Sequence, residues 1–102
     1  MCQRHNVTAI IYDKRGMQIS IGKNSYTKTH TLQAKYAKEV GLDMKIYLHA
    51  EIDALVKLKD WSRAYKIVVM RYGKNGEPLN AKPCKICQKA IEQSGIQVVQ
   101  HT

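Results

Sequence analysis

Apolar residues recur with two different periods along the chain, and these periods predict a mixed α/β fold. Runs that are rich in β-branched residues, or that alternate apolar with polar residues, predict strands at residues 7–12, 17–21, 66–72 and 96–100. Apolar positions at helical spacing predict helices at residues 32–40, 49–59 and 84–93. The predicted order is therefore β-β-α-α-β-α-β.

The run at residues 66–72 has the most continuous apolar character, which predicts a central strand buried on both faces. The helix and strand that follow it predict a parallel strand pair joined by a helical crossover. We expect one mixed β-sheet with helices packed on it, in a single domain spanning residues 1–102. Met17, Met44 and Met70 are expected to fill gaps in the core.

Charge and cysteine content narrow the class of protein. Seventeen Lys and Arg against eight Asp and Glu give a formal net charge of +9, which favours anionic partners such as nucleotides or nucleic acid. The lysines are spread along the chain, so charge alone favours nucleic acid only slightly. No apolar run is long enough to span a bilayer and no signal-peptide pattern opens the chain, so we expect no membrane partner. Three cysteines offer no disulfide framework, and we expect a reducing, cytoplasmic setting.

Two short motifs carry the candidate chemistry. Leu48-His49-Ala50-Glu51-Ile52 supplies an imidazole, and Pro83-Cys84-Lys85-Ile86-Cys87 supplies two thiols. Cys84 and Cys87 are spaced i and i+3, so both sulfurs face the same way on a first helical turn. His49 also opens a predicted helix, so two helix starts are expected to meet at one metal ion. One imidazole and two thiolates form a three-ligand zinc set, and a catalytic zinc keeps its fourth position open.

Glu51 is a carboxylate two residues from the first predicted ligand. Because the zinc set does not need it, Glu51 can serve instead as a proton shuttle. The alternative is a closed structural zinc site with a fourth protein ligand. The residues considered for that fourth position are Cys2, His5, His30 and His101.

The combination of H-x-E with P-C-x-x-C about thirty residues later resembles the signature of the zinc nucleobase deaminases. The chain is similar to the zinc-dependent cytidine and deoxycytidylate deaminase superfamily over most of its length. It looks closer to the branch of deoxycytidylate and tRNA adenosine deaminases, as a short, phage-like member. The resemblance implies a cytidine-deaminase-like fold, a zinc ion (Zn²⁺) on His49, Cys84 and Cys87, and Glu51 as the catalytic acid–base.

The resemblance also implies three substrate contacts. Asn24 stands where similar proteins place an Asn that contacts the sugar, although an ordinary turn Asn is the alternative. Ala50 stands where the backbone amide of the family meets the base. Ala81, two residues before Pro83, stands where another backbone group holds the pyrimidine.

Three functions fit these patterns. The first is hydrolytic deamination of a cytosine nucleotide or nucleoside to the uracil product and ammonia. The second is deamination of single-stranded nucleic acid or tRNA, and the third is a non-catalytic zinc-binding module. We favour the first because so short a chain has little surface for gripping a polynucleotide. Relatives carry flanking helices that are not found in this sequence, so we expect a homo-oligomer that covers the exposed faces.

Overall fold

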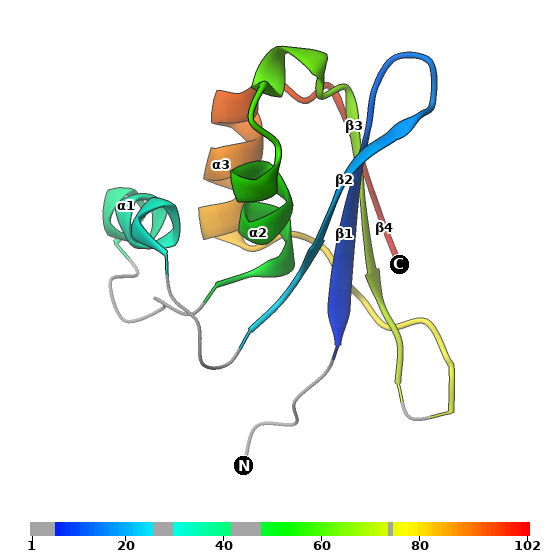
Figure 1. Ribbon diagram of the computed structural model, residues 1–102. Helices are drawn as coiled ribbons and strands as arrows, with labels where there is room; N and C mark the ends of the chain where they lie inside the picture. The colour runs from blue at the N-terminus through cyan, green and yellow to red at the C-terminus, as the bar shows by residue number, and fades with distance from the viewer. Residues whose placement is uncertain (1–5, 26–29, 42–47, 74) are drawn as a thin grey trace.

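The computed structural model in Figure 1 describes residues 6–25, 30–41, 48–73 and 75–102. Four strands form one sheet in the order β2-β1-β3-β4. Their bounds are Val7–Tyr12 for β1, Gln18–Lys23 for β2, Lys66–Arg71 for β3 and Val98–His101 for β4. β1 pairs antiparallel with both β2 and β3, whereas β3 and β4 are parallel. The mixed sheet and the predicted parallel pair are therefore confirmed.

Three α-helices complete the predicted order β-β-α-α-β-α-β. They are α1 at Thr31–Glu39, α2 at Ala50–Lys57 and α3 at Lys85–Ser94. All three lie on the same side of the sheet, as Figure 1 shows, and α2 packs directly on β2 and β1. Within the part of the chain that the structure describes, none of these helices is long and apolar enough to cross a membrane.

β3 is a central strand, as predicted, but the expected burial on both of its faces is wrong. Ile67 and Val69, beneath the helices, are 0% and 1% exposed. Val68 and Met70 point to the other face and are only partly buried. Since the described helices cover one face of the sheet, alternate residues of this apolar run stay partly open to solvent.

The expected role of the methionines in the core is also largely wrong. Met17 is 61% exposed, because it lies in the β1–β2 connection, where the Asp13 carboxylate accepts a 2.9 Å hydrogen bond from its amide. Met70 lies on the open face of the sheet, and Met44 falls outside the described residues.

Contacts between β2 and α2 fix the helix that carries His49 and Glu51. The Ser20 hydroxyl donates a 2.7 Å hydrogen bond to the carbonyl oxygen of Ala54. The Lys23 amide donates a 2.9 Å bond to the carboxylate of Asp53. Between them, Gly22 lets the backbones of strand and helix approach so closely that a Cβ there would overlap Ala50 and Ala54. The first turn of α2 is therefore held at a defined position on the sheet.

A short 3₁₀ helix, η1 at Trp61–Arg63, follows α2 and has no counterpart in the sequence prediction. The Asp60 carboxylate caps it by accepting from the amide of Ser62. The indole of Trp61 donates a 2.8 Å hydrogen bond to the carbonyl oxygen of Leu55. Trp61 thus packs against the end of α2 and satisfies one of its terminal carbonyl groups.

Candidate metal centre

The three predicted zinc ligands converge at the starts of two helices. His49 is the N-cap of α2 and Cys84 is the N-cap of α3, and both have extended backbone conformations. Cys87 lies in the first turn of α3, where the Cys84 carbonyl accepts the first helical bond from Gln88. The Gln88 side chain also donates a 2.9 Å bond to the carbonyl of Pro83, which fixes the approach to this turn. The predicted meeting of two helix starts is confirmed.

The separations within this set fit one small metal ion. Nδ1 of His49 lies 3.3 Å from Sγ of Cys87 and 3.5 Å from Sγ of Cys84. Tetrahedral zinc, with bonds of about 2.0 Å to nitrogen and about 2.3 Å to sulfur, would hold such atoms roughly 3.5 Å apart. All three ligand atoms lie within 4.8 Å of one another. One imidazole and two thiolates are also a donor set that zinc prefers.

The two thiols differ sharply in acidity before any metal is considered. The pKa of Cys84 is lowered to about 3, chiefly because Cys87 donates a hydrogen bond to its sulfur and also because His49 lies beside it. The pKa of Cys87 is raised well above its ordinary value by that same hydrogen bond and by burial. The hydrogen bond between the two sulfurs therefore favours the thiolate on Cys84 over the thiolate on Cys87. Both must be deprotonated to hold zinc.

Glu51 is the second residue of α2 and is only 6% exposed. Burial raises the pKa of its carboxyl group, while its own backbone amide, His49 and Cys87 act in the opposite direction. Among the described residues, only His49, Cys84 and Cys87 form a cluster able to hold a metal ion, so Glu51 lies outside it. A buried carboxyl group with a raised pKa beside a metal set is suited to holding and releasing a proton.

The structure does not bring His30 or His101 into this cluster as a fourth ligand. Nδ1 of His30 accepts a 3.0 Å hydrogen bond from the Leu32 amide, so this ring caps α1. His101 is exposed on β4. Cys2 and His5, the other residues considered for a closed site, lie outside the described residues.

A family model for the "cytidine and deoxycytidylate deaminase zinc-binding region" matches residues 1–102. The chain belongs to this deaminase family. No individual curated protein matches the chain significantly. Together with the His-Cys-Cys cluster, membership in the family identifies zinc as the metal of this centre and implies a nucleotide-type substrate.

The three predicted substrate contacts of this deaminase-family chain surround α2 and the approach to α3. Asn24 follows β2, and its side-chain carbonyl accepts a 2.9 Å hydrogen bond from the Val7 amide. Ala50 begins α2 and is 1% exposed. Ala81 is 8% exposed, and its amide donates to the carbonyl of Thr102. Any contact from the Ala81 backbone to a ligand would therefore come from its carbonyl group.

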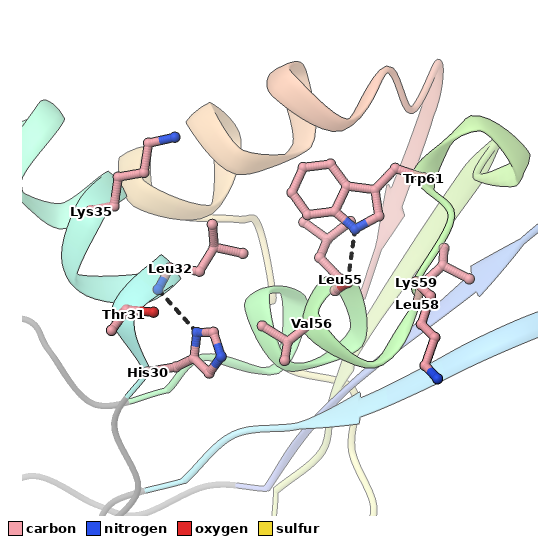
Figure 2. A pocket seen from close by; sticks show the side chains of 9 residues that line it. All are labelled: His30, Thr31, Leu32, Lys35, Leu55, Val56, Leu58, Lys59 and Trp61. Atoms are coloured by element: carbon pink, nitrogen blue, oxygen red, sulfur yellow. Dashed lines mark hydrogen bonds between the residues drawn. The ribbon is translucent and has the colours of Figure 1, made fainter.

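Figure 2 shows a separate hollow between α1, α2 and η1. Its lining is largely apolar, with Leu32, Leu55 and Trp61 among the residues, and it includes none of His49, Cys84, Cys87 and Glu51. The candidate chemistry therefore does not lie in this hollow.

Gln33 is a buried residue at the metal centre that the sequence analysis did not single out. It lies on α1 and is 0% exposed, and its side-chain oxygen accepts a bond from the His49 amide. The signal in the sequence is a polar residue in helical phase with Tyr36 and Ala37, on the face predicted to be apolar.

Proposed function

We propose that this chain is a hydrolytic deaminase of a cytosine nucleotide or nucleoside, in the branch of deoxycytidylate and tRNA adenosine deaminases. The reaction replaces the exocyclic amine of the base with oxygen from water and gives the uracil product and ammonia. The observation that carries the proposal is the placement of Glu51. Its buried carboxyl group lies next to the His-Cys-Cys set but outside it, as a general acid–base requires.

His49, Cys84 and Cys87 would hold the zinc ion. Both cysteines lie at the N-terminus of α3, where the helix dipole favours thiolate. Zinc bound in such a set supplies Lewis acidity and lowers the pKa of water toward neutrality. The carboxylate of Glu51 would transfer two protons in turn. The first comes from the attacking water and goes to the ring nitrogen, and the second comes from the hydroxyl of the adduct and goes to the amine, which leaves as ammonia. Burial raises the pKa of the Glu51 carboxyl group, which makes its carboxylate a stronger base for taking up a proton.

Three groups are proposed to orient the substrate. Asn24 would contact the sugar, and its bond to Val7 supports this role because it restrains the side chain at the end of β2. The amide of Ala50 is one of the first amides of α2, which lack partners within the helix and can meet an acceptor on the base. The carbonyl of Ala81 would accept from the pyrimidine.

A second candidate function is deamination of single-stranded nucleic acid or tRNA, which the formal charge of +9 favours. We rank it second because the described part of the chain forms only a small domain around the site. Free thiols at Cys84 and Cys87 support a reducing, cytoplasmic setting for either function.

The test combines zinc analysis with a substrate panel. The wild-type protein and Glu51→Gln are assayed on dCMP, CMP, cytidine and a single-stranded oligonucleotide, with detection of ammonia or of the uracil product. Turnover of a free nucleotide or nucleoside by the wild type alone is the expected result. Turnover of the oligonucleotide only would favour the second function. Stoichiometric zinc without turnover of any panel substrate would contradict deamination of free cytosine nucleotides and of single-stranded nucleic acid, and would favour a non-catalytic zinc module.

A further inference from the structure

Gln33 is the most completely buried polar side chain in the described part of the chain. It is 0% exposed, whereas Ser20, Glu51 and Ser94, the other buried polar residues described, retain 6–9% exposure. It lies on the face of α1 that also buries Tyr36 and Ala37. Burying a side-chain amide destabilises the fold unless its polar atoms are hydrogen-bonded. The hydrogen-bond partners of Gln33 therefore explain why this position can hold a polar residue.

The contact made by the Gln33 oxygen is with the backbone of a metal ligand. Oε1 of Gln33 accepts a 3.2 Å hydrogen bond from the amide of His49. His49 is the N-cap of α2, so its amide takes no part in the hydrogen-bond ladder of that helix. In a capping box, a Glu or Gln at the third helical position accepts from this amide. The third position of α2 is Ile52, which offers no acceptor, so Gln33 supplies the bond from another helix.

We infer that Gln33 is a positioning residue, which fixes the backbone of His49 so that its imidazole meets Cys84 and Cys87. α1 packs against both α2 and α3, the two helices that carry the ligands. The amide bond from Gln33 therefore sets where α2 begins relative to α3. The separations of 3.3 and 3.5 Å between the imidazole and the two sulfurs depend on this placement.

The inference rests on the proposed metal role of His49 but not on the proposed substrate or reaction. If Gln33 positions His49, the wild type should lose zinc more slowly than a variant that lacks the Gln33 acceptor. Replacing a residue that orients a metal ligand typically changes metal affinity about 10- to 100-fold. Zinc release to a chromophoric chelator and the absorption spectrum of the cobalt-substituted protein report this without any turnover.

Three variants separate positioning from general stability. Gln33→Leu removes the acceptor but suits a buried apolar site. Gln33→Glu keeps an acceptor oxygen but places an ionisable group where burial disfavours charge. Tyr36→Leu is the matched control. Tyr36 lies on the same face of the helix and is only 2% exposed, but it is Gln33 and not Tyr36 that accepts from the His49 amide.

We expect zinc release from Gln33→Leu to be about 10- to 100-fold faster than from wild type, with a changed cobalt spectrum. Gln33→Glu and Tyr36→Leu should both melt at a lower temperature than the wild type. Both should nevertheless release zinc at close to the wild-type rate. Equal release rates for Gln33→Leu and Tyr36→Leu at matched melting temperatures would overturn the inference. If Gln33→Leu does not fold, amide exchange in the zinc-loaded wild type decides: protection of the His49 amide supports the bond, and rapid exchange overturns it. A wild-type protein that binds no zinc would refute the metal centre itself, and this inference with it.

Discussion

Gly22 of β2 and Ala54 of α2 approach so closely that no side chain fits between their backbones. A Cβ built on Gly22 would overlap the amide nitrogen of Ala54 and the carbonyl oxygen of Ala50. Both obstacles are backbone atoms, which cannot rotate away. The Ser20 hydroxyl donates a hydrogen bond to the carbonyl oxygen of Ala54, so β2 fixes the distance between α2 and the sheet.

Gly22→Ala is therefore expected to push the start of α2 away from the sheet. The variant should lose about 1–3 kcal/mol of unfolding free energy, as is usual for overpacking, and should retain zinc less well. Gly16→Ala is a suitable control. Gly16 has a φ of +83°, which strains any other residue, but an added Cβ meets nothing within 4 Å. Equal zinc retention in both variants would argue against a role for Gly22 in the metal centre.

Zinc should copurify at about one ion per chain and should link α2 to α3. Cys87→Ala is expected to lose the metal and to lower the melting temperature, because binding to a set formed only in the folded chain stabilises that state. Treatment of the wild type with a strong chelator should lower the melting temperature in the same way. The zinc centre would be contradicted if neither the wild type nor the cysteine variant contained metal and both melted at the same temperature.

Glu51→Gln should separate chemistry from metal binding. We expect nearly unchanged zinc content and melting temperature, since the carboxylate lies outside the ligand cluster. Turnover on the cytosine panel should fall by roughly 10²–10⁴-fold, the usual contribution of a general acid–base group. Reduced zinc occupancy would show instead that Glu51 is a ligand.

Asn24 tests the proposed sugar contact. Its carbonyl oxygen is bonded to the Val7 amide, so Asn24→Asp retains this bond while replacing the amide nitrogen with oxygen. We expect Asn24→Asp to keep zinc and most of the stability but to raise KM on the preferred cytosine substrate. An unchanged KM would leave Asn24 with the alternative role of an ordinary turn residue.

The open face of the sheet supports the expectation of a homo-oligomer. Ile21, Ile10 and Val68 stand in register across β2, β1 and β3, on the face away from the described helices. Ile21 is 40% exposed there. Sedimentation should therefore show a dimer or larger assembly, and Ile21→Lys should shift it toward monomer. Met17→Lys, in the β1–β2 connection, is the control. A clean monomer at micromolar concentration would contradict the expectation.

The parts of this structure that local sequence governs were predictable. Cys84 and Cys87 share a helical turn, so the convergence of the two thiols followed from short-range geometry. His49 was joined to them through the resemblance to the deaminase signature and not through any local pattern. Contacts that link distant segments were not predictable. The bond from Gln33 to His49 joins residues 16 positions apart, and no pattern within either segment indicates it. The apolar run of β3 gave no sign that all three described helices would lie on one face.

The ligand set also divides by distance along the chain, and this has a consequence for the order in which the centre assembles. Cys84 and Cys87 lie three positions apart, whereas His49 is separated from them by 35 and 38 positions. Closing the short loop costs much less chain entropy than closing the long one. We therefore expect an ion that meets the chain during folding to bind first to the cysteine pair. His49 is expected to join them only once α2 has packed against α3, so its coordination would report that the segment carrying β1, β2 and α2 has docked on α3.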